Sequence, residues 1–308
     1  MRINTYMAYE TSISQLQSRQ ASLTRAQEQL TSGKRVDRAS DDPAAAARAE
    51  RALAAIGRAD ANKRALDASR NSMTLTESAL GDAGEMLQQA RELAISAGNG
   101  SLVDSDRLTI ANAIRGLRND LLAVANRTDG AGRYLFGGQG ADSPPLVDGP
   151  GGVQYFGTTG EQLAASGETT PLTVDGNAAF LATPDPADPT QPLSVFAALD
   201  RIINGLLVPG QTSTQVADIV STGLGDIDAT GANLAQWRAR TGEALNRIDG
   251  VESRLSQSKL DAQRDRSNAE DLDLIEAISD FQNQQTGYDA ALKMFSTVQR
   301  MSLFDYLK

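Results

Sequence analysis

Two adjacent carboxylates, Asp41 and Asp42, are the first side chains in this sequence whose type and spacing could do chemistry. A carboxylate pair could serve general acid–base catalysis. Neighbouring side chains point in different directions, however, and Pro43 gives Asp42 another role. Asp followed by Pro favours a helix start, because the carboxylate accepts free N–H groups of the first turn and proline has no N–H to satisfy. We therefore interpret Asp42 and Pro43 as a helix cap and Gly33 as the end of the preceding helix.

Two further acidic pairs, Asp104/Asp106 and Asp226/Asp228, could bind a hard cation. Neither lies in an EF-hand-type loop closed by a bidentate glutamate, so we interpret both as negative charge at helix starts. The glycine-rich segments GGQG (137–140) and GPGG (149–152) lack the Lys-Ser/Thr of a phosphate-binding loop and are interpreted as turns.

The composition removes several kinds of chemistry. The chain has no Cys and no His, which excludes zinc sites with thiolate or imidazole ligands, Ser-His-Asp and Cys-His catalysis, and histidine pH switches. The sequence therefore predicts no catalytic, cofactor-binding or metal-binding residues and no enzymatic activity.

Charge and hydropathy limit the partners. A net charge of −10 with 5% aromatic residues argues against binding to nucleic acid or to an anionic membrane surface. No apolar run is long enough to span a bilayer, so membrane insertion is not expected. The N-terminal MRINTYMAYETSIS does not have the pattern of a cleaved secretory signal. If the protein is exported, something other than such a signal directs it.

The prolines divide the chain into helical and non-helical parts. Nine of the ten lie between Pro144 and Pro209, and proline disrupts helix interiors. Residues 137–192 mix Gly, Pro, Asp and Thr with short apolar runs, which predicts a small β-rich insertion. The flanking residues 43–136 and 193–264 are expected to form a helical rod domain.

Sevenfold spacing of apolar residues is the strongest structural signal. Such spacing places side chains on one stripe of a helix, and a partner helix must cover that stripe. The fold class expected is mainly α, an elongated antiparallel helical bundle or coiled coil built from both chain ends. The repeats are Leu66, Met73, Leu80, Leu87 and Ala94; Ile110, Leu117 and Val124, with Ile114 and Leu121 between them; and Ile227, Leu234, Thr241, Ile248 and Leu255.

The two chain ends, residues 1–42 and 265–308, are predicted to form a separate coiled-coil assembly domain. Each end is one helix (1–32 and roughly 265–308), and ordering a long helix carries an entropy penalty that one buried stripe does not offset. We expect both ends to be disordered in the monomer and ordered in an assembly. The predicted assembly interface comprises Ile13, Leu16, Leu23, Leu30, Leu274, Ile278, Phe281, Tyr288, Leu292, Phe295, Val298, Leu303 and Phe304.

Two features of these end helices complete the prediction. The C-terminal helix has a second apolar face with Ala291, Met294, Val298 and Met301. Glutamines also interrupt the apolar stripes, and they either fix the register of packing or are simply exposed. These are Gln20, Gln27, Gln285 and Gln299.

The ordered motifs of the chain resemble the bacterial flagellin superfamily. The resemblance covers about 1–138 and 193–308, and LTSGKRVDRASDDPAAAARA (30–49) is its N-terminal signature. Within the superfamily, MRINT with Tyr9, the segment 40–43, NRTDGAGRYLFGG (126–138) and the ending QQTGYDAALKMFSTVQRMSLFDYLK (284–308) are most similar to hook–filament junction proteins, the type 3 hook-associated proteins.

This resemblance implies a structural, extracellular subunit of the bacterial flagellum. It implies export from the cytoplasm without a cleaved signal peptide, and a ring of subunits between the first hook-associated protein and flagellin or the filament cap. It also implies a cytoplasmic export chaperone on the C-terminal helix, an outward-facing insertion, and a corner near residues 33–42 between the terminal helix and the rod. The alternatives are a flagellin-type filament monomer and, more remotely, a secreted coiled-coil adhesin.

Overall fold

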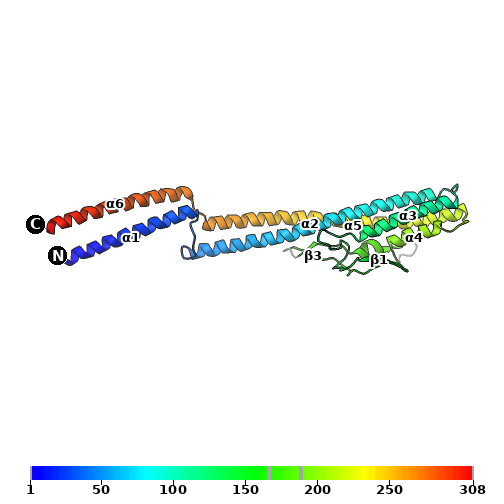
Figure 1. The fold of residues 1–308 in the computed structure, drawn as a ribbon, viewed down its shortest axis with the longest axis horizontal. Helices are drawn as coiled ribbons and strands as arrows, with labels where there is room; N and C mark the ends of the chain where they lie inside the picture. The colour runs from blue at the N-terminus through cyan, green and yellow to red at the C-terminus, as the bar shows by residue number, and fades with distance from the viewer. Residues whose placement is uncertain (1, 165–167, 187–189, 307–308) are drawn as a thin grey trace. The chain divides into compact units, whose positions relative to one another are not determined.

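Long helices carry most of this chain, and Figure 1 traces their order along the sequence. The computed structural model describes the backbone of residues 2–164, 168–186 and 190–306, and within these the side chains from Met7 to Thr297 except Ala8. The chain divides into two units, residues 1–59 with 257–308 and residues 60–256. The helices are α1 (Arg2–Ser32), α2 (Pro43–Ala97), α3 (Asp104–Ala125), α4 (Val195–Leu206), α5 (Ser213–Glu270) and α6 (Leu274–Tyr306).

The first unit is a pair of helices followed by the neighbouring ends of α2 and α5. Helices α1 and α6 lie side by side (Figure 1). In the same unit, the buried residues of α2 and α5 are mostly small. The buried alanines are Ala45, Ala49, Ala52 and Ala59 of α2 and Ala262 and Ala269 of α5.

The second unit contains the main hydrophobic core. The sevenfold repeat of α2 is buried throughout, with Leu66, Met73, Leu80, Leu87 and Ala94 at most 2% exposed. Most of its counterparts in α3 and α5 are also buried, while Ile110, Leu117 and Leu255 are half-buried against the core, so the predicted helical bundle is confirmed. The buried counterparts are Ile114, Leu121, Val124, Ile227, Leu234, Thr241 and Ile248.

Helix α4 joins this core through close helix packing that the sequence did not reveal. Gly205 of α4 lies so near Ile219 that a Cβ there would be 2.5 Å from Ile219 Cγ2. Gly223 of α5 faces Ile202, where a Cβ would be 2.1 Å from Cγ1. These glycines, which resemble loop residues in the sequence, are needed for contact between two helices.

The insertion is β-rich, as predicted, but its strands are short and form three separate antiparallel pairs. The pairs are β1 (Leu146–Gly149) with β2 (Gly152–Tyr155), β3 (Leu163–Ala164) with β4 (Thr170–Pro171), and β5 (Thr183–Pro184) with β6 (Pro192–Leu193). In the first pair Leu146 is opposite Tyr155 and Gly149 is opposite Gly152. A single π-helical turn, η1 (Asn177–Leu181), lies between the second and third pairs.

Aromatic side chains attach the insertion to the helical bundle. The rings of Phe136 and Phe180 meet edge to face at 4.9 Å between centroids, and Phe180 lies 6.4 Å from Phe196 of α4. Trp237 Nε1 of α5 donates to the carbonyl of Ala178 at 3.1 Å. The insertion therefore shares its core with the helices of this unit.

A buried cation also ties the insertion to the bundle. The Arg118 side chain of α3 is 7% exposed and pairs with Asp148 of β1 and with Asp200 of α4, 3.1 Å from Nε to Oδ1 of Asp200. Its guanidinium lies 5.6 Å from the centre of the Phe196 ring. The hydrogen bonds that its guanidinium donates to the carboxylates of Asp148 and Asp200 raise the pKa of Arg118 although burial lowers it.

The glycine-rich segment 149–152 is the turn between β1 and β2, as predicted, whereas Gly137 and Gly138 form isolated β-bridges next to a turn at Gln139. Gly138 has φ +63°, and a Cβ there would lie 1.8 Å from the carbonyl oxygen of Thr158. Gly152 (φ +95°) follows the turn between β1 and β2. At these positions an L side chain is strained, which explains the glycines without a phosphate ligand.

Two boundaries differ from prediction. Helix α5 begins at Ser213, so Asp226 and Asp228 lie inside a helix and the interpretation as helix-start charge is wrong for this pair. Asp226 is 2% exposed and pairs with Arg201 at 2.9 Å, while Asp228 pairs with Arg91 at 2.8 Å. The C-terminal helix begins at Leu274 and not near residue 265, because α5 continues to Glu270 and the chain turns at 271–273.

The structure contains neither a membrane-spanning helix nor a metal cluster within its described residues. No helix among them is both long and apolar enough to cross a membrane. Within the same residues, no three or more Asp and Glu side chains are grouped so that they could hold a metal ion.

Candidate assembly interface

One row of aromatic side chains on α6 faces α1. Phe281, Tyr288 and Phe295 recur every seven residues and are half-buried. The rings of Phe295 and Tyr9 are 5.4 Å apart between centroids and tilted by 35°. We call these three aromatic residues the inner row. The predicted interface residues of α1, Ile13, Leu16, Leu23 and Leu30, are half-buried as well.

A second row on α6 is exposed in the single chain. Leu274, Ile278 and Leu292 are 53%, 48% and 41% exposed, and Ile275 beside them is 86% exposed. We call Leu274, Ile278 and Leu292 the outer row. The predicted interface of the C-terminal helix thus divides into a covered row and an uncovered row. The side chains of Val298, Leu303 and Phe304, and with them Met301, lie outside the described residues.

The glutamines and the second-face residues of the two helices also divide into exposed and partly buried positions. Gln20, Gln27 and Gln285 are exposed, which favours simple exposure over a register role between α1 and α6. The glutamine that enters the contact is Gln284, which sequence reasoning missed. On the second face, Ala291 is half-buried and Met294 is 70% exposed. The side chain of Gln299 lies outside the described residues.

The corner at residues 33–42 connects two chain segments by backbone hydrogen bonds. Gly33 ends α1 with φ +71°, and its N–H donates to Gln29 at 2.8 Å. The N–H groups of Arg35 and Val36 both donate to the carbonyl of Glu270, at 2.7 and 3.3 Å, and the N–H of Leu272 donates to the carbonyl of Gly33 at 3.1 Å. The turn after α1 and the turn before α6 therefore lie side by side.

Asp42 has the geometry of a helix cap. Its Oδ1 accepts the N–H groups of Ala44 and Ala45 at 3.1 and 2.9 Å, and Pro43 is the first residue of α2. The hydrogen bond from Ala45, aided by the Arg35 guanidinium, holds the pKa of Asp42 below its usual value although desolvation raises it. The other member of the pair, Asp41, accepts the N–H of Arg38 at 2.9 Å. Each carboxylate thus has its own backbone partner.

Capping by Asp42 predicts an acid-sensitive start of α2. The pKa of Asp42 is lower in the folded chain than in the unfolded chain. Above its ordinary pKa, the ionised carboxylate therefore contributes fully to the stability of the helix start, and this stabilisation is lost as the pH falls through the lowered pKa. Asp42→Ala should speed amide exchange at Ala44 and Ala45 at neutral pH. Asp42→Asn, which keeps an acceptor, should preserve protection and remove its acid dependence. Equal exchange in wild type and Asp42→Ala would contradict the cap.

Comparison with known proteins places the chain in a family. Residues 3–141 match the bacterial flagellin N-terminal helical region and residues 224–307 the bacterial flagellin C-terminal helical region. Flagellar hook-associated protein 3 of Salmonella typhimurium is 32% identical over 99% of this chain and 99% of its own length. The protein of the same name from Escherichia coli is 32% identical, with both chains covered in full. Flagellin of Bacillus subtilis is 27% identical over 91% of this chain and 90% of its own.

A solved structure agrees on the fold. The flagellar junction protein FlgL from Legionella pneumophila superimposes with a TM-score of 0.57 at 18% identity, over 62% of this chain and 95% of its own. Matches to both helical regions, together with relatives that are 32% identical along their whole length, show that the chain belongs to the flagellin family, in the group of flagellar hook-associated proteins 3.

Proposed function

We propose that this chain is a structural subunit of the bacterial flagellum that joins the hook to the filament by assembling through its two terminal helices. The observation that carries the proposal is the outer row of α6, whose three large apolar side chains are 41–53% exposed although α1 already covers the inner row beside them. Grouped apolar side chains that stay exposed mark surfaces that another molecule covers. The relatives are hook-associated and junction proteins, which supports a location at the junction between hook and filament.

The energetics support assembly through these helices. A helix pair buried along one stripe gains little from packing relative to the conformational entropy that ordering removes. The outer-row side chains are already about half buried, so covering them adds about half of the 1.5–3 kcal/mol that full burial of a large apolar side chain contributes. We therefore propose that residues 1–42 and 265–308 form an assembly domain, disordered in the monomer and ordered between copies.

The proposed partners follow from this position. Copies of the chain form a ring, with the first hook-associated protein on one side and flagellin with the filament cap on the other. Before assembly, a cytoplasmic export chaperone covers the exposed face of the C-terminal helix. The protein then reaches the cell exterior without a cleaved signal peptide. The role is structural, and we assign no reaction to it.

A filament monomer is the competing function, because flagellins match the same chain. The two functions differ in where the protein lies and how far it polymerises. Immunogold labelling or density of purified flagella should place this chain only at the hook end, and purified protein added to filament seeds should not grow long filaments. Labelling along the whole filament would overturn the junction assignment in favour of flagellin.

A further inference from the structure

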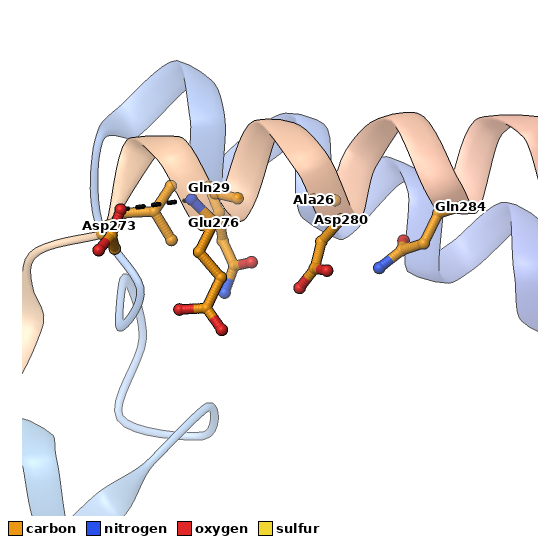
Figure 2. A pocket seen from close by; sticks show the side chains of 8 residues that line it. Ala26, Gln29, Asp273, Glu276, Asp280 and Gln284 are labelled. Carbon is orange, nitrogen blue, oxygen red and sulfur yellow. Dashed lines mark hydrogen bonds between the residues drawn. The ribbon is translucent and has the colours of Figure 1, made fainter.

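A small acidic groove lies on α6 beside its contact with α1. Its volume is about 140 Å³, and its lining includes Ala26 and Gln29 of α1. Figure 2 shows Asp273 just before α6, Glu276 in its first turn and Asp280 one turn further, with Gln284 beyond them on the same side of the groove. At 100° per residue, this groove and the outer row flank the α1 contact on opposite sides of α6. The acidic groove is thus a separate surface.

The groove offers acceptors that lack donors. Asp273 Oδ1 accepts the N–H groups of Ile275 and Glu276 at 3.0 and 3.3 Å and so caps α6. Glu276 and Asp280 have no ion-pair partner among the described residues. The Oε1 atom of Gln284 is buried and, within the described residues, meets no donor. A buried acceptor without a donor is unfavourable, and the neighbouring carboxylates favour a cationic one.

Cations without carboxylate partners line another groove of the same unit. Arg48 and Arg51 of α2 border a depression of about 530 Å³ whose lining includes Ala52, Ala55 and Ala262. Both arginines are exposed, and neither has an ion-pair or hydrogen-bond partner among the described residues. Asp265 and Asn268 also line it. We call this depression the arginine groove.

We propose that the acidic groove of one copy receives Arg48 and Arg51 of a neighbouring copy. A guanidinium supplies the donors that Glu276, Asp280 and the Gln284 oxygen lack, in the charge-assisted geometry that arginine favours. The two grooves are different surfaces of one chain, so their contact is heterologous and generates rings or helical assemblies. The inference rests on the proposed function, because it specifies how copies meet within the assembly.

Charge reversal on both sides tests this contact. Arg48→Glu with Arg51→Glu, or Glu276→Gln with Asp280→Arg, should each weaken subunit retention in a deletion strain at least about tenfold, because opposite charges become like charges. Glu276→Gln avoids a positive charge in the first turn of α6. All four changes in one chain should restore retention. A matched control is Arg58→Glu on α2, which is exposed and outside the grooves and should behave as wild type.

Cross-linking gives an independent readout, because the chain contains no cysteine of its own. Flagella from cells that co-produce Arg51→Cys and Glu276→Cys, with different tags, should form a disulfide between the two variants. The pair Arg58→Cys and Glu276→Cys should not. Equal cross-linking of both pairs, or wild-type retention of the reversed variants, would overturn the proposed contact. Failure of the unmodified chain to restore filaments would instead refute the proposed function.

Discussion

Replacing Ile278 and Leu292 together with aspartate is expected to abolish attachment of filaments while leaving the isolated protein as stable as wild type. Both side chains belong to the outer row and are 48% and 41% exposed in the single chain, so aspartate meets water there. In the assembly the same carboxylates would be buried against a neighbour without a cation. An unpaired buried charge is unfavourable by several kcal/mol, so association should weaken more than about a thousandfold.

Two measurements compare the variant with wild type. One is thermal unfolding of the purified monomer, and the other is the amount of flagellin that cells release into the medium. Lys293→Asp is the matched control, since it places the same carboxylate at an exposed polar position of α6. Phe295→Asp should also release flagellin, because this ring packs against Tyr9 and its loss weakens the α1–α6 pair that assembly orders. Normal filaments in the Ile278→Asp, Leu292→Asp variant would remove the outer row from the assembly interface.

Neutralising both carboxylates around Arg118 is expected to destabilise the second unit more than removing the arginine. In Asp148→Asn with Asp200→Asn, a guanidinium that is 7% exposed loses both charged partners. Breaking a fully buried pair from one side is unfavourable by about 3–5 kcal/mol. Because the carboxylates of Asp148 and Asp200 are partly exposed to solvent, we expect the free energy of unfolding to fall by about 2–3 kcal/mol here.

The comparison variant is Arg118→Met, which removes the buried charge together with its need for partners and keeps an apolar side chain beside Phe196. It should be less destabilising than the double asparagine variant in denaturant unfolding of the full chain. Asp120→Asn, an exposed change on the same helix, should leave the free energy of unfolding within about 0.5 kcal/mol of wild type. Equal destabilisation by the double asparagine variant and Arg118→Met would show that packing, and not the uncompensated charge, is responsible.

The helical core was predictable because its signal is local and repeated. Met73 and Leu80 recur at the helical period whatever their partners are, and burial follows from that period. Asp226 was misassigned because Gly223 and Gly225 resemble the residues of a loop. Only the structure shows that Gly223 makes room for Ile202 of α4.

Contacts across long stretches of sequence were beyond prediction. Nothing near Arg118 in the sequence identifies Asp148 or Asp200 as its partners. The sevenfold period likewise placed Phe281 and Ile278 on one surface of α6, although α1 covers the first and leaves the second exposed. The sevenfold period shows which residues share a stripe of the helix. How much of that stripe a single neighbouring helix covers depends on how the two helices cross.

The paired turns at Gly33 and Leu272 have a mechanical consequence. A single connecting segment would let the terminal helices rotate about a few backbone φ and ψ angles. Here two connecting segments of the chain pass the corner together and are joined by three backbone hydrogen bonds, from Arg35 and Val36 to Glu270 and from Leu272 to Gly33. Rotation of one connecting segment therefore also moves the other, so torque applied along α1 and α6 is transmitted through the corner and is not dissipated there.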